Sequence, residues 1–157
     1  MYRIHRKRSP AFWAAFPFLF LVLSCSEKFP IDVGRLVIAL PGAPVSVDPR
    51  VATDAYGEQI LQMTHASLVR RDAAGNPVPD LAEGWESPDP LTHLFRLRRA
   101  LRFHDGRPLT SSDVRYTFEW ILDPSNRSPH RALYRHVASI GTPDDRTVVF
   151  RLAEPFA

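Results

Sequence analysis

Hydrophobic residues in the body of the chain follow two periods, one typical of helices and one typical of strands. Residues 53–69 place Ile60, Leu61 and Leu68 at helical spacing. A threonine followed by an aspartate starts this stretch, and either side chain could accept a hydrogen bond from the first turn. The pattern predicts a helix of about four turns.

A second helix is predicted after residue 109. Thr110 stands at the N-cap position with Asp113 three residues later, an arrangement in which each residue can bond the other's backbone N–H group. Val114, Phe118 and Ile121 then fall on one stripe of the helix. We expect that stripe to face the core.

The remaining apolar runs are short and resemble strands. Residues 35–40 are apolar and β-branched without alternation, which predicts a strand buried on both faces. Residues 92–98 alternate and predict a half-buried strand, and residues 101–103 predict a short second one. Residues 146–152 predict a final strand. Helices and strands thus mix along one chain of domain size, which indicates an α/β fold (α+β, mixed sheet).

The connections between these elements carry strong turn signals. Residues 41–50 contain three prolines and a glycine, so neither a helix nor a central strand is expected there. Gly75-Asn76-Pro77 and Pro143-Asp144-Asp145 predict turns. The segments on either side of the first of these turns are short.

The N-terminus has a different composition from the body. Four basic residues lie in the first ten positions and are followed by AFWAAFPFLFLVLSC, residues 11–25. A basic start and an apolar stretch of about 13 residues are typical of a secretory signal. The stretch is short for a membrane helix, which needs about 20 apolar residues, and Pro17 interrupts it. A buried N-terminal helix is the alternative.

The single cysteine, Cys25, ends this apolar stretch. The sequence VLSC resembles a bacterial lipobox, in which Val22 and Ser24 fit the pattern and Leu23 is larger than usual. The resemblance implies that residues 1–24 are a lipoprotein signal peptide, that Cys25 is the lipidation site, and that the protein is anchored to a membrane through lipid. The alternative is a buried thiol acting as a small hydrophobe. Residues 25–34 are polar and predict a tether.

The net charge of +3 comes from the N-terminal segment. Without residues 1–24, 20 − 4 = 16 basic side chains face 17 acidic ones. The body is therefore close to neutral, and we expect no nucleic-acid partner.

His104 and Asp105 form the most conspicuous polar pair, since a histidine beside an aspartate can bind a metal or move a proton. They lie, however, between an expected strand end and a helix cap, and Asp-Gly is a strong turn dipeptide because Gly106 accepts positive φ. The other histidines form no metal-ligand spacing. We therefore expect a turn, no metal, no cofactor and no enzymatic site. A metal-dependent hydrolase that uses His104 and Asp105 stays open as the alternative.

Several segments, taken in order, resemble the extracytoplasmic solute-binding proteins of peptide and nickel ABC importers, family 5. They are LVIALPGAPVSVDPRVATDA, ASLVRRDAAGNPVPDLAEGWE, FRLRRALRFHDGRPLTSSDVRYTFEWILDP, SPHR and DDRTVVFRLAEPFA. The resemblance implies that residues 35–157 are part of the N-terminal lobe of a periplasmic-binding-protein-like fold of class II. It also implies a peptide or small solute as ligand, ABC permease subunits as partners, and an extracytoplasmic location.

The same resemblance suggests where the ligand would lie. The segment Thr53, Asp54, Ala55 and Tyr56, and the loop that contains His130, match places where the family approaches its ligand. An ordinary surface loop is the alternative for each. Family members are far longer than this chain, so we expect an N-terminal fragment or a natural truncation. A truncated surface lipoprotein that takes no part in transport is a further alternative.

Overall fold

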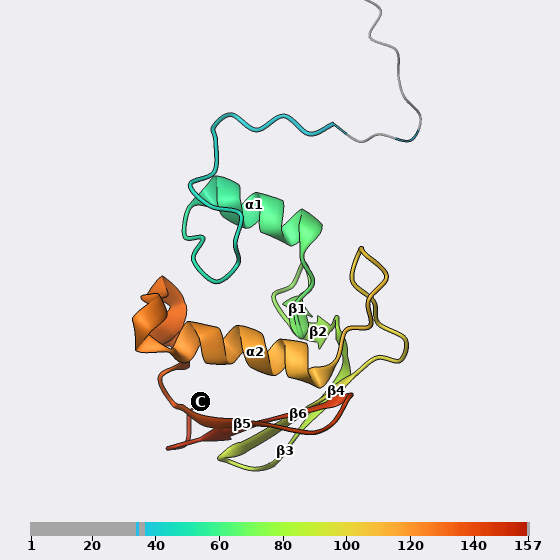
Figure 1. Cartoon of the computed structure of the whole chain (residues 1–157), viewed down its shortest axis with the longest axis vertical. Helices are drawn as coiled ribbons and strands as arrows, with labels where there is room; N and C mark the ends of the chain where they lie inside the picture. Colours follow the sequence, from blue (N-terminus) through green and yellow to red (C-terminus); the bar gives the residue numbers. More distant parts are fainter. Residues whose placement is uncertain (1–33, 35–36, 157) are drawn as a thin grey trace, which may run out of the picture. The chain divides into compact units, whose positions relative to one another are not determined.

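The computed structural model describes residue 34 and residues 37–156. The chain divides into two compact units, residues 1–38 and residues 39–157. Nearly all described residues belong to the second unit. The elements of that unit, in chain order, are α1 (Ala55–Thr64), β1 (Val69–Arg71), β2 (Pro77–Pro79), β3 (Ala82–Asp89), β4 (Thr92–Leu97), α2 (Ser111–Leu122), the 3₁₀ helices η1 (Pro124–Asn126) and η2 (Pro129–Tyr134), β5 (Val137–Asp144) and β6 (Thr147–Leu152) (Figure 1).

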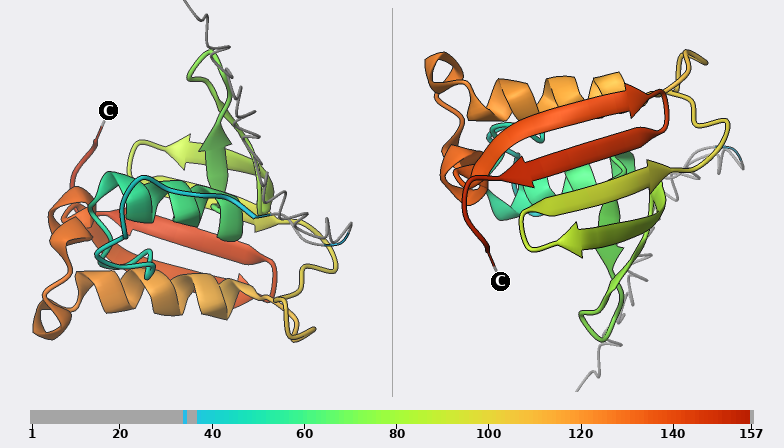
Figure 2. Two further views of the ribbon diagram at one scale, coloured as in Figure 1. Left: turned by 90° about the horizontal axis from the view of Figure 1, so that it is seen from above. Right: turned by 90° about the horizontal axis from the view of Figure 1, so that it is seen from below.

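Four antiparallel strands form the main sheet, in the order β3-β4-β6-β5, and β1 pairs with β2 in a separate hairpin. Helix α2 runs across one face of the main sheet (Figure 2). Mixed helix and sheet agree with the predicted fold class. The half-buried strand predicted at residues 92–98 is β4, and the strand predicted at 146–152 is β6.

The core lies between α2 and the main sheet. Its buried members come from α2 and the three strands beneath it, and they are Leu97, Val114, Ile140, Val148 and Phe150. Phe118 of α2 packs edge-on against Phe150, with 5.0 Å between ring centroids. The predicted stripe on α2 therefore faces the core, with Val114 and Ile121 buried.

Both predicted helices are present, and their N-caps agree with the sequence. Asp54 caps α1, because its Oδ1 accepts a hydrogen bond from the Gly57 N–H at 2.9 Å. At α2, the Asp113 carboxylate accepts from the Thr110 N–H at 2.8 Å. Helix α1 is shorter than predicted, since it ends at Thr64.

The strand predictions need three corrections, two for strands predicted where none forms and one for strands that were not predicted. Residues 37–40 form no strand, and Val37 and Ile38 are 73% and 50% exposed. A strand buried on both faces needs partners along its edges and cover on both sides, and the two sheets of the described chain consist of β1–β6 alone. Residues 101–103 contribute only an isolated bridge from Arg102 to Pro108.

The third correction is that β3 and β5 were not predicted. Both contain a glycine and a proline, which weaken the strand signal. Both are the outer strands of the sheet, and register shifts interrupt both pairings. An edge strand tolerates these residues because only one of its edges must be hydrogen-bonded.

Phe150 should contribute more to stability than any exposed apolar side chain. Its ring is 7% exposed and contacts the rings of Phe118 and Phe95. We expect Phe150→Ala to lower the free energy of unfolding by about 3–5 kcal/mol, because it removes a buried ring and leaves a cavity. Leu133→Ala is the matched control, since Leu133 is 70% exposed. Equal shifts of the urea midpoint in both variants would contradict the assigned core.

Candidate ligand-facing site

The candidate site is built around the irregular segment of residues 41–54, which contacts α2 through Trp120 and the start of η2 through Ser128 and His130. Within this segment, the Ser46 hydroxyl accepts from the Asp48 N–H at 3.1 Å, and the Asp48 carboxylate accepts from the Arg50 N–H at 2.9 Å. These contacts replace the helix or sheet hydrogen bonds that three prolines exclude. The segment therefore has a defined path without regular structure.

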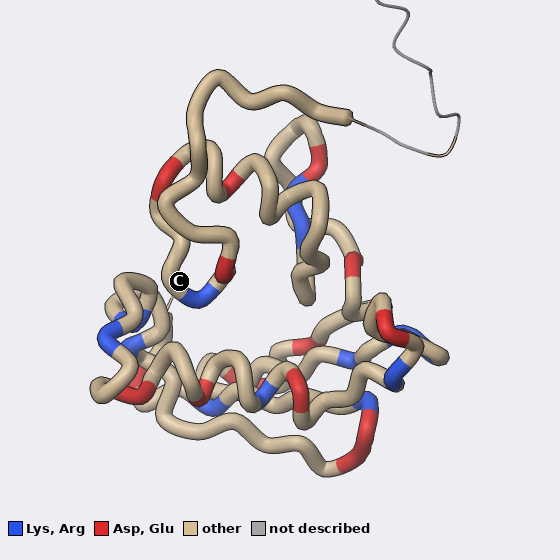
Figure 3. Tube along the Cα trace, turned by 45° about the horizontal axis from the view of Figure 1, so that its top comes forward, with Lys and Arg blue, Asp and Glu red and all other residues tan. Residues whose placement is uncertain are grey.

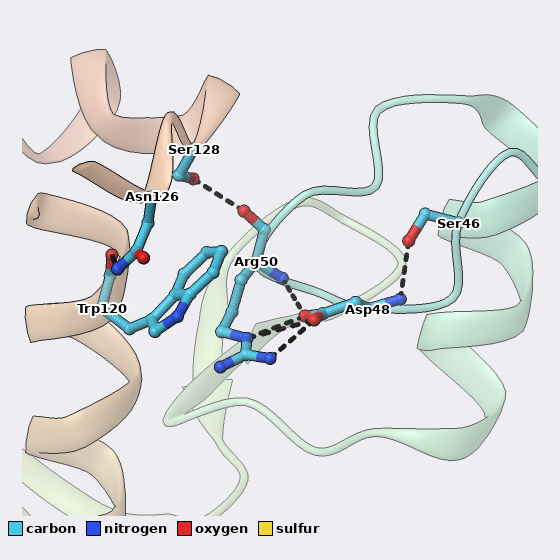
Figure 4. Close-up of polar contacts among 6 residues, drawn as sticks. All are labelled: Ser46, Asp48, Arg50, Trp120, Asn126 and Ser128. Carbon is cyan, nitrogen blue, oxygen red and sulfur yellow. Dashed lines mark hydrogen bonds and ion pairs between the residues drawn. The ribbon is translucent and has the colours of Figure 1, made fainter. Parts of the chain in front are cut away.

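An ion pair and a stacked ring fix Arg50. Its Nη2 lies 2.7 Å from Asp48 Oδ2, and its guanidinium carbon lies 4.2 Å from the centroid of the Trp120 ring (Figure 4). The hydrogen bond from Arg50 lowers the pKa of the Asp48 carboxyl below its usual value. Arg50 thus connects the segment to the side of α2.

Two hydrogen bonds join the segment to the start of η2, far along the sequence. The Ser128 hydroxyl donates to the Arg50 carbonyl at 2.6 Å (Figure 4). His130 Nε2 lies 2.8 Å from the Ala52 carbonyl oxygen. A carbonyl can only accept, so this contact requires a proton on Nε2. Ser128 and Ala52 are both buried. We call these two bonds the Ser128–His130 clasp.

Close approach at two glycines fixes the other side of the segment. A Cβ atom on Gly42 would lie 2.4 Å from the Tyr56 ring, and one on Gly57 would lie 2.6 Å from the Ser46 carbonyl. Only glycine therefore fits at these positions without displacing its neighbours. The segment is packed directly onto the first turn of α1.

The sequence-predicted site residues thus come together, but they are not equally free to bind a ligand. Both carboxylate oxygens of Asp54 are in use, one by Gly57 N–H and one by Val45 N–H at 3.1 Å. These bonds lower the pKa of Asp54, the Gly57 bond contributing most. Asp54 has a structural role as a cap, and a ligand would have to displace one of these bonds to reach it.

Fewer contacts occupy the other three residues of this predicted segment, which are Thr53, Ala55 and Tyr56. Thr53 and Ala55 are exposed, and Tyr56 uses its ring against Gly42 while no described residue pairs with its hydroxyl. His130 is half-buried and directs one nitrogen to Ala52, and no described residue pairs with its Nδ1. Among the predicted ligand-side residues, the polar atoms for which the described residues provide no partner are thus the hydroxyls of Thr53 and Tyr56 and Nδ1 of His130.

Sequence reasoning missed Arg50 and Trp120 as members of this site, and it placed Ser128 in the ligand-side loop without its contact to Arg50. The sequence Asp-Pro-Arg at 48–50 favours a local ion pair, but nothing in the chain links it to a tryptophan 70 positions later. The Ser-Pro pair at 128 and 129 signals the start of a short helix, and Ser128 does cap η2 by accepting from His130 N–H. Its second role, as a donor to Arg50, depends on the tertiary fold.

His104 and Asp105 lie away from this segment, at an exposed hairpin tip. The Gly106 N–H donates to the Phe103 carbonyl at 2.9 Å, and Gly106 has φ 85°. Asp105 accepts from the N–H two residues on, at 2.9 Å, as a turn aspartate does. In the described part of the chain, no group of three histidine, cysteine or acidic side chains could hold a metal ion. The turn interpretation is confirmed.

Cys25 and the lipoprotein signal predicted at residues 1–24 lie outside the described residues, as does most of the tether predicted at residues 25–34. Among residues 34 and 37–156, no helix is both long and apolar enough to cross a bilayer.

Comparison with known proteins places this geometry in a family. Residues 76–157 match the family model described as bacterial extracellular solute-binding proteins, family 5, middle part. These residues make up more than half of the chain. The protein therefore belongs to the family 5 solute-binding proteins.

Similar proteins from named organisms agree with this family assignment. A putative ABC transporter peptide-binding protein of Brucella ovis is 44% identical over 89 residues, which are 56% of this chain and 17% of the relative. The oligopeptide-binding protein OppA of Bacillus subtilis is 32% identical over 96 residues, which are 60% of this chain and 18% of that protein.

Solved structures show the same fold. OppA of Burkholderia pseudomallei superposes with a TM-score of 0.71 and 27% identity, over 75% of this chain and 26% of that one. The binding protein AgaA of Agrobacterium tumefaciens R10, solved with agropinic acid, gives a TM-score of 0.69 and 36% identity over 73% of this chain and 23% of its own. The chain thus spans about a quarter or less of the length of these proteins.

Gly106 and His104 offer a direct test of the turn. We expect Gly106→Val to lower the free energy of unfolding by about 1 kcal/mol or more, because a β-branched residue is strained at positive φ. His104→Ala should change stability little, since His104 is exposed. Chemical denaturation of both variants, with zinc content measured on the same samples, checks this. Stoichiometric zinc that is lost in His104→Ala would instead support the hydrolase alternative.

Proposed function

We propose that this protein is the N-terminal part of a substrate-binding lipoprotein that serves an ABC importer of peptides or related solutes. Membership of family 5 over residues 76–157 is the observation that carries the proposal. Named relatives include peptide-binding and oligopeptide-binding proteins, and one structural neighbour holds agropinic acid. The proposed ligand is therefore a peptide or a small polar solute.

The geometry of the clasp supports a binding role rather than catalysis. A rigid core of α2 and the main sheet positions an irregular segment, and binding residues of proteins are often placed on loops fixed in this way. The polar groups of Thr53, Tyr56 and His130 that have no partner among the described residues can donate and accept hydrogen bonds, which suits them to a peptide backbone. In this proposal the residues bind ligand and catalyse nothing.

One lobe gives a ligand only partial enclosure. Affinity in a two-lobed receptor comes from burying the ligand, so that its polar groups are paired and water is excluded. An exposed hydrogen bond contributes only about 1 kcal/mol net, and association costs at least several kcal/mol of translational and rotational freedom. In our proposal, further sequence of the receptor supplies the rest of the first lobe and the whole second lobe.

The proposed location is extracytoplasmic, with the protein held at a membrane through lipid on Cys25. The basic start, the apolar stretch and the sequence VLSC support this. Two or three acyl chains, each methylene contributing about 0.8 kcal/mol, would make the anchor effectively permanent. In this proposal ABC permease subunits in the same membrane receive the ligand.

Lipid attachment at Cys25 can be tested in bacterial cells. Labelling with a radioactive fatty acid should mark the wild-type chain and leave Cys25→Ser unmarked, because the thiol is the acceptor. Ser26→Ala is the control for a neighbouring change. Equal labelling of wild type and Cys25→Ser would rule the anchor out.

Peptide binding can be tested by calorimetric titration with mixed di- to pentapeptides. Residues 26–157 alone should bind with dissociation constants of about 1 mM or higher, because a single partial lobe leaves the bound ligand exposed to water. Micromolar binding would show that this chain is a complete receptor.

A hybrid tests the function itself. In it, residues 76–157 replace the matching part of an oligopeptide-binding relative. The hybrid should keep peptide affinity within about tenfold of the parent. A folded hybrid that has lost peptide binding would contradict the proposed function.

A further inference from the structure

A pocket of about 650 Å³ opens at the C-terminal end of α2, next to the Ser128–His130 clasp, and Ser128 is one of the residues that line it. The end of α2, both 3₁₀ helices and the start of β5 surround it. Its size lies within the range typical of small-molecule sites, about 300–1,000 Å³. The residues that carry its charge are Arg127, Arg131 and Arg135.

None of the residues that line this pocket is acidic. Asp123, just before η1, interacts with one of these arginines: its pKa is lowered mainly by a hydrogen bond from the Ser125 N–H and also by the charge of Arg131. Asp123 is thus partly occupied, and it can offset at most one of three guanidinium charges. Basic residues gather along this segment in the charge view (Figure 3). The pocket has a net positive charge.

Two of the arginines differ from an ordinary surface arginine, Arg131 in its side-chain contact and Arg127 in its backbone conformation at the C-cap of η1. Arg131 Nε donates to the Leu122 carbonyl at 2.9 Å, which holds the side chain at the end of α2 and leaves its terminal nitrogens for other partners. Arg127 has φ 50° and ψ 35°, the left-handed conformation. Glycine or asparagine adopts this conformation at lower cost.

The strain at Arg127 is a second, independent observation. Among the described residues, only Ala100 and Arg127 have positive φ without being glycine. Strained backbone often marks positions where the side chain is needed for function. Here the strained residue supplies one of the pocket's three positive charges.

We propose that this pocket binds a phosphate-class oxyanion. The guanidinium fork matches phosphate oxygens with two parallel hydrogen bonds. Three such groups around one cavity suit a multiply charged anion with several oxygens better than a single carboxylate. The phosphate could be free in solution or part of a phospholipid headgroup, and both sources offer the same oxygens to the arginines.

Titration of the full 157-residue chain with sodium phosphate, against sodium chloride at equal ionic strength, tests the proposal. We expect saturable binding in the wild type and at least fivefold weaker binding in Arg127→Gly and in Arg135→Gln. Arg70→Gln is the matched control, because Arg70 is an exposed arginine on β1, outside the pocket. Arg127→Gly should melt no lower than wild type, since glycine relieves the left-handed strain.

Vesicles distinguish the two sources of phosphate. If the headgroup is the ligand, Arg127→Gly should bind phosphatidylglycerol vesicles more weakly than Arg70→Gln does. If free phosphate is the ligand, the two variants should bind vesicles equally while differing in the phosphate titration. Phosphate binding that is absent, equal in all variants, or matched by acetate would overturn the proposal.

Discussion

The packing of Phe118 against Phe150 is the interaction on which the rest of the described structure depends. It joins α2 to β6, a central strand of the main sheet, and Phe118 also meets Tyr134 of η2 edge-on at 5.1 Å. Burial raises the pKa of the Tyr134 hydroxyl, consistent with a ring enclosed at this junction. One aromatic side chain therefore links the sheet, the long helix and the short helix that carries the clasp.

This link explains how a chain with few regular elements can hold an irregular segment in place. The three prolines at residues 41–50 exclude a ladder of backbone hydrogen bonds, so the segment depends on side chains from elsewhere. Ser128 and His130 provide them, and both lie where η2 begins, in the short helix that ends at Tyr134 of the aromatic junction. Asp54 and the glycines at 42 and 57 fix the opposite side. On Thr53, Tyr56 and His130, hydroxyl and imidazole atoms have no partner among the described residues, and the proposed binding role would use them.

Local rules predicted those parts of the fold that local contacts stabilise. The capping pair Thr110 and Asp113, the Asp-Gly turn at residue 105 and the alternation in β4 all depend on residues close in sequence. The edge strands β3 and β5 were missed because their glycines and prolines oppose strand formation, and pairing with β4 and β6 overrides that preference. The strand predicted at residues 35–40 was wrong for the opposite reason. Its apolar composition favours a buried strand, but the sheets of the described chain provide it with no partner strand.

The candidate site was predictable only in part. The resemblance to family 5 pointed to Thr53–Tyr56 and His130, and the structure brings these residues near one another without testing whether they bind a ligand. The cap formed by Asp54 is local and followed from the sequence. The contact of Arg50 with Trp120 and the bond from Ser128 to Arg50 span about 70 residues of sequence or more, and no local pattern encodes them.

Hydrogen exchange in Ser128→Ala tests most directly whether the clasp holds the irregular segment. Amides of residues 50–52, which bond to Asp48, should exchange about fivefold faster than in wild type, the effect of losing about 1 kcal/mol of hydrogen bonding. Amides of β4 and β6 should be unchanged, and Ser112→Ala, an exposed serine on α2, should have no effect. Unchanged exchange at residues 50–52 in Ser128→Ala would contradict this account of the site.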